Sequence, residues 1–335
     1  MLDQPEFILA RLKEFQAAVR NVLVRSRTQA NLHAVDRISS ADTIYAIDSL
    51  VEPLLESFCE ELSKHIPLIL IAEGLQNEHG VEGSKTFPQG TREEDARIRL
   101  IVDPIDGTRG LMYDKRSAWA LAGVASNKGP HTRLRDIEVS IMTELPTSKL
   151  GYADVLWAIK GQGAHGERVD LRSGQSQPLP LQPSSAGTIN HGFAMISNFF
   201  PGTKVLASEL MEQLVQELIG PLDVFKATVF EDQYISTGGQ FYELIVGHDR
   251  FNADLRPLFY RLQNQPEGMC CHPYDCAALL IAEESGVIIT DGLGHPLDGP
   301  LDVTTGISWA GYANPDLRRS IEPLLTGFLQ EREIK

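Results

Sequence analysis

The segment from residue 100 to residue 108 constrains the fold of this chain more than any other. It reads Leu-Ile-Val-Asp-Pro-Ile-Asp-Gly-Thr, so an apolar run passes directly into a turn with two carboxylates. A short apolar run bounded by turn residues predicts a buried strand. The proline restrains the turn and the glycine lets the backbone approach a ligand closely. Asp103 and Asp106 can then face one hard cation while the amides of Gly107 and Thr108 face an anion. Asp, Pro and Gly all favour turns, so a purely structural turn is the alternative.

The charge balance of the chain narrows the class of its partners. Its 335 residues are enough for two domains or one large two-lobed unit. The formal net charge of -15 argues against nonspecific binding of a nucleic-acid polymer, which requires clustered Lys and Arg. An acidic protein is poorly suited to anionic phosphates unless bound cations neutralise some of its carboxylates. The charge balance is therefore a first indication of a metal.

The first residues do not have the pattern of a secretory signal. They carry early acids and the helical spacing of Phe7, Ile8, Leu12 and Phe15, without a basic start followed by an apolar stretch. The most apolar windows, such as residues 66–72, are far shorter than the ~20 residues that cross a bilayer. We therefore expect a cytoplasmic protein that does not interact with a membrane.

Hydrophobic periodicity predicts helices and strands along the whole chain. Amphipathic helices are expected at residues 2–25, 41–65, 205–219 and 275–284, and strands at residues 66–72, 98–102, 118–125, 137–143, 155–159 and 287–290. Residues 170–188 are rich in Ser, Pro, Gln and Gly and lack apolar periodicity, which marks a boundary between lobes. The expected division is an N-terminal lobe of residues 1–185 and a C-terminal lobe of residues 186–335.

Three further acids stand at the ends of predicted elements. Glu73 follows the strand of residues 66–72, and Asp275 opens a helix after His-Pro-Tyr. Asp42 begins the helix of residues 41–65, where Ser-Ser-Ala-Asp suits an N-cap. Capping alone would explain Asp42 and Asp275, so each has a structural interpretation beside a functional one.

The cysteines favour ordinary reduced thiols over a metal site. Three of the four, Cys270, Cys271 and Cys276, crowd beside His272, while Cys59 stands apart. Paired Cys-x-x-Cys spacings are absent, and two adjacent cysteines cannot easily turn toward one tetrahedral ion. A zinc site is therefore the weaker hypothesis.

Together these segments resemble the inositol monophosphatase superfamily of magnesium-dependent, lithium-sensitive phosphatases. Members carry, in this order, an acid-bearing first helix, a strand ending in Gly-Glu-Glu, an Asp-Pro-Ile-Asp-Gly-Thr loop, and a Trp-Asp-x-Ala-Ala helix ending near Glu-Ala-Gly-Gly. The matching segments are Asp36 with Asp42, residues 72–74, residues 103–108, and residues 274–278 leading to residues 284–287. The resemblance spans most of the chain. It implies an α/β (α+β) protein, built as the layered α-β-α-β-α sandwich of inositol monophosphatases and sugar phosphatases.

This sequence departs from the pattern of the superfamily at several positions. Gly74 replaces the second acid of Gly-Glu-Glu, Tyr274 replaces the usual Trp, and the last motif has lost a glycine. Insertions occupy residues 76–96 and 127–136. None of these changes removes an expected metal ligand.

The resemblance implies a metal site and a mechanism. The implied ligands of two or three Mg²⁺ ions are Glu73, Asp103, the carbonyl of Ile105, Asp106 and Asp275. Such ions neutralise the phosphate, lower the pKa of a bound water and stabilise the leaving oxygen. Members of the superfamily pair a threonine with an early helical aspartate to orient the attacking water, which implies catalytic roles for Thr108 and Asp42. No phosphoenzyme is expected.

The resemblance also implies a small phosphorylated metabolite as the partner. The implied substrate contacts are Gly107, Thr108, Arg109, Ser236, Thr237, Asp254 and Asp275, with Asp254 near the position of a hydroxyl-binding acid. Inositol or sugar monophosphates are the default substrates. The pair Arg109-Gly110 resembles the Lys-Gly of phosphatases that act on 3'-phosphoadenosine 5'-phosphate, so a 3'(2'),5'-bisphosphate nucleotidase is the alternative. A homodimer is left open.

Two hypotheses of another class stand beside the enzyme. A binding protein could keep the fold and metal site without catalysis, but the complete set of four metal acids together with Thr108 and Asp42 argues against it. The carboxylates could also form a structural calcium site, although the loop lacks the alternating acids of an EF-hand.

Overall fold

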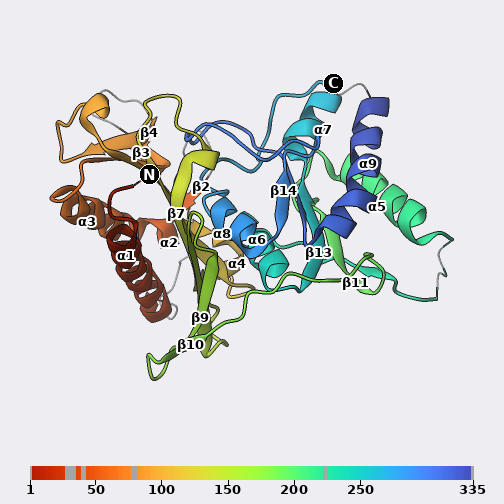
Figure 1. Ribbon diagram of the computed structural model, residues 1–335, viewed down its shortest axis with the longest axis horizontal. Helices are drawn as coiled ribbons and strands as arrows, with labels where there is room; N and C mark the ends of the chain where they lie inside the picture. Colours follow the sequence, from red (N-terminus) through yellow and green to blue (C-terminus); the bar gives the residue numbers. More distant parts are fainter. Residues whose placement is uncertain are drawn as a thin grey trace.

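The structure is a computed structural model that describes residues 2–26, 35–38, 43–76, 82–221, 223 and 225–332 (Figure 1). Asp42 lies outside the described residues, as does the helix start expected at residue 41. Strands β1 (Val35–Ile38) and β2 (Thr43–Tyr45) form a small antiparallel ribbon beside the gap.

An eight-stranded sheet is the framework of the first half of the chain. In spatial order it consists of β10 (Ser176–Pro178), β9 (Ala164–Asp170), β8 (Tyr152–Ile159), β7 (Ile137–Leu145), β6 (Ala118–Ser126), β5 (Ile98–Asp106), β3 (Leu68–Gln76) and β4 (Glu82–Phe87). Strands β3 and β5 are parallel, and the other neighbours are antiparallel. The central strands β5 and β6 are almost entirely buried. Their near-continuous apolar sequences suit a sheet that is covered on both faces.

Helices α1 (Pro5–Ser26) and α3 (Glu52–Ser63) cover one face of this sheet. In α1, Ile8, Leu12, Phe15 and Val19 recur at the three- and four-residue spacing of one helical face and are buried in the same core cluster as β5 and β7. Among the described helices, none is both long enough and apolar enough to span a membrane.

A second sheet of five strands lies in the other half of the molecule. Its order is β12 (Val229–Phe230), β11 (Gly192–Ile196), β13 (Asp249–Asp254), β15 (Trp309–Tyr312) and β14 (Ile288–Thr290). Helices α5 (Lys204–Ile219) and α9 (Pro315–Glu331) pack on its outer side. Helices α6 (Thr237–Ile245) and α8 (Leu279–Ser285) contact strands of both sheets.

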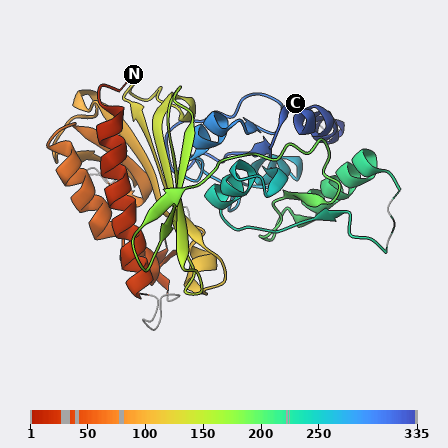
Figure 2. The same ribbon diagram turned by 60° about the horizontal axis from the view of Figure 1, so that its bottom comes forward.

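The molecule therefore has five layers, with helices, sheet, helices, sheet and helices in succession. Figure 2 shows this order from α1 and α3 on one side to α5 and α9 on the other. The α6 and α8 pair between the sheets belongs to one large apolar core that also includes β6 and β15. The predicted α-β-α-β-α sandwich is confirmed.

Three predicted elements differ from the structure. The helix expected at residues 41–65 is interrupted: β2 is followed by the short α2 (Ala46–Ser49), and α3 begins at Glu52. Pro53 lies in the first turn of α3, and because a proline has no amide proton it cannot donate the hydrogen bond that would continue α2 into α3. The expected linker of residues 170–188 contains the edge strand β10. The helix expected at residues 275–284 starts only at Leu279.

Candidate functional site

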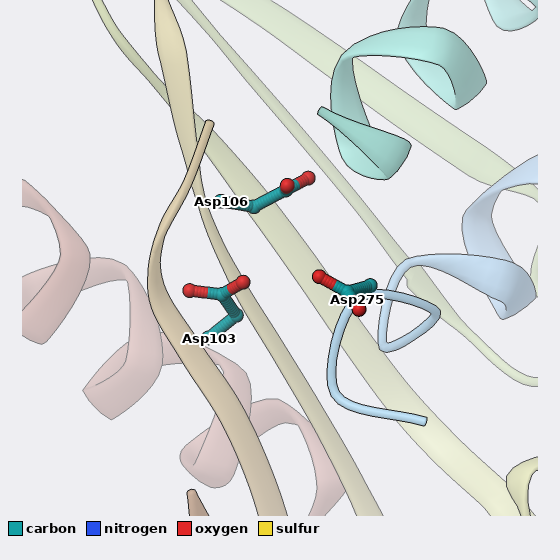
Figure 3. A group of neighbouring side chains, drawn as sticks. All are labelled: Asp103, Asp106 and Asp275. Atoms are coloured by element: carbon teal, nitrogen blue, oxygen red, sulfur yellow. The ribbon is translucent and has the colours of Figure 1, made fainter. Parts of the chain in front are cut away.

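Three aspartates converge where the two halves of the molecule meet. Asp103 and Asp106 come from β5, and Asp275 comes from the turn before α8. One oxygen of each carboxylate lies within 4.8 Å of the other two. Figure 3 shows this group, with two side chains from one strand and the third from the facing loop. Among the described residues, it is the one cluster of His, Cys, Asp or Glu found with a spacing that suits a metal ion.

A bulge in β5 turns both of its aspartates toward the same side. In a regular strand, residues three positions apart point to opposite faces of the sheet. Here Asp103 pairs with Leu121 and Asp106 pairs with Trp119, so β5 holds one residue more than β6 over this stretch. The amide of Ile105 donates to Oδ1 of Asp103 over 2.9 Å, which fixes the turn. The bulge explains why the two acids of the Asp-Pro-Ile-Asp motif act as neighbours.

Gly107 closes the bulge with a backbone conformation that suits only glycine. Its φ angle is +95°, in the left-handed region. A Cβ atom at this position would lie 3.0 Å from Cβ of Ser236 and 3.1 Å from the carbonyl oxygen of Ile235. Helix α4 (Thr108–Met112) follows at once and places Thr108 and Arg109 beside the aspartates.

Asp106 connects β5 to the start of α6. Its Oδ2 accepts hydrogen bonds from the amide of Gly238 at 2.6 Å and from the hydroxyl of Ser236 at 2.9 Å. Ser236 is also the N-cap of α6, because its Oγ accepts from the amide of Gly239 over 2.8 Å. The carboxylate is thus held by amide and hydroxyl donors at the positive end of a helix dipole.

Asp275 is held by a series of tight turns, not by a helix. The amide of His272 donates to Oδ2 of Asp275 over 2.6 Å, and the amide of Asp275 donates to the carbonyl of His272. The amides of Cys276, Ala277 and Leu279 also donate to the carbonyl oxygen three residues back. Pro273 lacks an amide proton and has a fixed φ, which suits a turn. The predicted helix start at Asp275 is therefore wrong, although its position beside Asp103 and Asp106 agrees with a ligand role.

Burial raises the pKa of each of the three carboxyls, and repulsion from neighbouring carboxylates adds to the rise for Asp103 and Asp275. Burial raises the pKa of Asp106 to about 7, although the hydrogen bonds from Gly238 and Ser236 act to lower it. The pKa values of Asp103 and Asp275 are raised well above their ordinary range, first by burial and then by the neighbouring carboxylates. Three clustered acids whose simultaneous ionisation is unfavourable without a cation, with oxygen as their donor atom, fit a hard divalent cation such as Mg²⁺.

Glu73 lies at the edge of this group. It belongs to β3, and its charge raises the pKa of both Asp103 and Asp275. The hydroxyl of Tyr274 lies 3.4 Å from Oε2 of Glu73, so the tyrosine that replaces the usual tryptophan contacts this acid. Glu73 lines the same cavity as the three aspartates but does not share their 4.8 Å cluster.

Thr108 has an aspartate beside it, and that residue is Asp48. Oγ1 of Thr108 lies 3.1 Å from Oδ1 of Asp48 and 2.8 Å from the carbonyl oxygen of Ile105. Asp48 is in α2, and its Oδ2 accepts from the amide of Tyr45 over 2.8 Å. We expected Asp42 in this place, which lies outside the described residues. The sequence signal that could have identified Asp48 is Pro53. A proline favours the start of a helix, so a new helix near Pro53 would leave Asp48 in a separate short helix before it.

A cavity of about 430 Å³ opens over the acidic cluster. Its wall includes most of the expected substrate contacts, namely Gly107, Thr108, Arg109, Ser236, Thr237 and Asp275. This volume is within the range of small-molecule sites.

Asp254 is not part of the cavity wall. Its side chain is only 1% exposed, and its carboxylate is occupied by the guanidinium of Arg256. The expected contact between Asp254 and a substrate hydroxyl therefore has no support in the structure, because the acid is buried behind the arginine that does line the cavity.

All four cysteines are free thiols. Sγ of Cys271 lies 3.4 Å from Sγ of Cys276, and both side chains are buried. Within the described part of the chain, the candidate metal cluster contains aspartates alone, so the zinc hypothesis gains no support.

The sequence matches no protein-family model and no curated protein sequence. Solved structures, in contrast, match over nearly the whole chain. SuhB of Mycobacterium tuberculosis has a TM-score of 0.62 at 14% identity, with 98% of each chain covered. The IMPase of Thermotoga maritima has a TM-score of 0.60 at 14% identity, covering 99% of this chain and 100% of that one.

A third structure is the MJ0109 gene product, an inositol monophosphatase-fructose 1,6 bisphosphatase. Its TM-score is 0.62 at 15% identity, and 96% of this chain and 100% of that chain are covered. The fold expected from the sequence motifs is thus found independently in the backbone. This chain has the fold of the inositol monophosphatase superfamily.

Proposed function

We propose that this protein is a metal-dependent phosphatase that hydrolyses a small phosphate monoester. One observation carries the proposal: three aspartates from both halves of the molecule, Asp106 buried and the other two half-buried, face one another on the wall of a cavity large enough for a metabolite. The fold shared with inositol monophosphatases supports the same reaction class.

The metal ligands would be Asp103, Asp106 and Asp275, with Glu73 and the carbonyl of Ile105 completing the set for two or three Mg²⁺ ions. A bound divalent cation would neutralise the phosphate and lower the pKa of a water molecule. The raised pKa values of the three aspartates support this assignment, since each ionised carboxylate needs a nearby positive charge.

Residues of the chain itself would orient the reactants. We assign Thr108 and Asp48 to the attacking water, because the hydroxyl and the carboxylate lie 3.1 Å apart on the cavity wall. The carboxylate can accept a proton from water, while the threonine hydroxyl holds its direction. The backbone of Gly107 and Thr108 and the side chains of Ser236 and Thr237 would contact the phosphate.

The test is a panel of phosphate esters assayed for phosphate release with Mg²⁺ and with a chelator. The panel contains inositol 1-phosphate, sugar monophosphates and 3'-phosphoadenosine 5'-phosphate, so that it separates the monophosphatase from the bisphosphate nucleotidase. Mg²⁺-dependent turnover of at least one ester is the expected result. Binding of esters without any turnover would instead support a catalytically inactive homologue.

A further inference from the structure

Arg256 is a buried arginine whose position on the cavity wall is fixed by Asp254. Its Nε lies 2.8 Å from Oδ1 of Asp254, and its Nη2 lies 2.5 Å from Oδ2, so the contact is bidentate. The two side chains are 5% and 1% exposed. Asp254 ends β13 and Arg256 begins α7 (Arg256–Leu262), so a single tight turn sets the geometry of the pair.

The guanidinium is anchored from a second direction. Its Nη1 donates to the carbonyl oxygen of Met269 over 3.1 Å. Of the five N–H groups, one on Nη1 and one on Nη2 have no acceptor among the described residues. A buried guanidinium whose orientation is fixed by hydrogen bonds, and which still has N–H groups without an acceptor, is well suited to bind an anion.

Two aromatic rings flank this guanidinium. Its Cζ atom lies 4.8 Å from the ring centre of Phe199 and 5.4 Å from that of Phe200. The ring of Phe200 also has the guanidinium of Arg109 at 5.3 Å. Aromatic faces attract a guanidinium and exclude water around it, which strengthens the remaining hydrogen bonds.

Arg256 and the acidic cluster lie on the wall of the same cavity. The charge of Arg256 acts against the rise in the pKa of Asp275. Phe199 and Phe200 line this cavity too, so an ester whose phosphate is held at the aspartates would share the cavity with Arg256 and these two rings.

We propose that Arg256 determines specificity by binding a second anionic group, a carboxylate or a phosphate, on the leaving group of the substrate. The inference rests on the proposed phosphatase function and deepens it. The substrate class is then a phosphate monoester with a second negative charge, not the ester of a neutral polyol. A polyol hydroxyl could not use Asp254 as an acceptor, because the guanidinium of Arg256 already pairs with that carboxylate. The rings of Phe199 and Phe200 near Arg256 offer no strong acceptor either.

The test compares matched pairs of esters that differ in the second anion alone. Suitable pairs are 3-phosphoglycerate with glycerol 1-phosphate, fructose 1,6-bisphosphate with fructose 1-phosphate, and inositol 1,4-bisphosphate with inositol 1-phosphate. The measured quantity is the ratio of kcat/KM for the anionic member to that for the neutral member. We expect the wild-type protein to favour the anionic member of at least one pair by on the order of 10–100-fold, the range for hydrogen bonds to a charged group.

Arg256→Met should remove this preference mainly through KM of the anionic esters, with kcat/KM for the neutral members changed by less than about threefold. The single variant leaves Asp254 buried without its partner and could unfold. The double variant Asp254→Asn with Arg256→Met removes the unpaired charge and keeps the test valid. Its ratio should match that of the single variant.

A second ion pair provides the matched control. Arg168 also holds a buried aspartate, Asp154, through two contacts of 2.7 Å, but it lies outside the cavity. The variant Asp154→Asn with Arg168→Met should lower stability and leave the ratio of kcat/KM unchanged. An equal loss for both members of a pair in the Arg256 variants would show a merely structural role and overturn the inference.

Failure of the inference is distinguishable from failure of the proposed function. Equal hydrolysis of anionic and neutral esters by the wild-type protein would overturn the substrate class while the phosphatase stands. Absence of hydrolysis for every ester would count against the phosphatase. In that case calorimetric binding of each pair to wild type and Arg256→Met still decides the inference, because equal affinities would contradict it.

Discussion

Asp106 is the residue through which the two sheets share one site. It is the last residue of β5, and its carboxylate is bonded to Ser236 and Gly238 at the start of α6. Asp106→Asn keeps the side-chain shape and removes one negative charge from the cluster of three aspartates. We expect kcat to fall at least 100-fold and the Mg²⁺-induced rise in Tm to be lost, while the metal-free protein stays at least as stable as wild type.

Thermal denaturation with and without Mg²⁺, beside phosphate release, measures these effects of Asp106→Asn. An unfolded variant whose soluble fraction retains wild-type specific activity would mean that Asp106 is only a turn residue.

Asp48 and Thr108 should act as one unit. Asp48→Asn and Thr108→Ala should each lower kcat by a factor on the order of 10²–10⁴, because each removes half of the pair that orients the attacking water. The double variant should be little worse than the poorer single variant. Steady-state kinetics of the three variants measures this coupling, and multiplicative losses would mean independent roles.

Asp42→Asn separates the two aspartates proposed for this role. The structure supports Asp48, whose carboxylate contacts Thr108, while Asp42 was expected from the sequence. We predict a kcat for Asp42→Asn within about threefold of wild type. A loss as large as that of Asp48→Asn would restore the original assignment.

The sequence predicted the proximity of Asp103 and Asp106 but not the contacts that Thr108 and Asp254 make with other side chains. Asp103 and Asp106 share one short motif whose turn chemistry is local, so their proximity could be predicted. Asp48 and Thr108 are 60 positions apart in the sequence, so no local motif links them. The one sequence signal is Pro53, which indicates that Asp48 does not belong to the helix that follows it. The pairing of Asp254 with Arg256 could not be predicted, because it depends on how α7 leaves β13, which periodicity does not reveal.

At the scale of elements, the start of α6 positions Asp106 by close packing against β5 and β6. A Cβ atom on Gly238 would lie 2.6 Å from Leu121 and 3.0 Å from Oδ2 of Asp106. Gly238→Ala should therefore displace the carboxylate, weaken Mg²⁺ binding about tenfold and destabilise the protein by about 1–3 kcal/mol. Calorimetric titration and thermal denaturation measure the two effects.

Gly327→Ala in α9 is the matched control for Gly238→Ala. Among the described residues, no atom outside the neighbouring backbone of α9 lies within 4 Å of its added Cβ, so the change should stabilise the helix by up to about 1 kcal/mol and leave Mg²⁺ binding intact. Unchanged metal affinity in Gly238→Ala would show that α6 does not hold Asp106 in place.

The elements predicted best are those with the longest unambiguous patterns. Helices α1 and α5 agree with their predictions to within a few residues, as do the buried strands β5, β6 and β7. The edge strand β10 has an exposed, polar sequence that resembles a linker. Helix α8 begins late because the residues before it form turns around Pro273, although their apolar spacing is helical.

At the scale of the whole molecule, the site depends on both sheets being in place. Asp103 and Asp106 belong to the eight-stranded sheet, whereas Asp275 and α6 follow strands of the five-stranded sheet. A cation that binds all three aspartates would therefore stabilise the folded arrangement of the two halves and raise Tm with its concentration. The order of the layers could be predicted from the resemblance. The distances between Asp275 and the two aspartates of β5 could not be predicted and come from the structure.

The most direct test of the central claim is the dependence of phosphate release on Mg²⁺ for the ester that the panel identifies as the best substrate. The account predicts no turnover in excess chelator and full recovery when Mg²⁺ is added back, because without a cation nothing would neutralise the phosphate or activate a water molecule at the three clustered aspartates. Full turnover in excess chelator would contradict it.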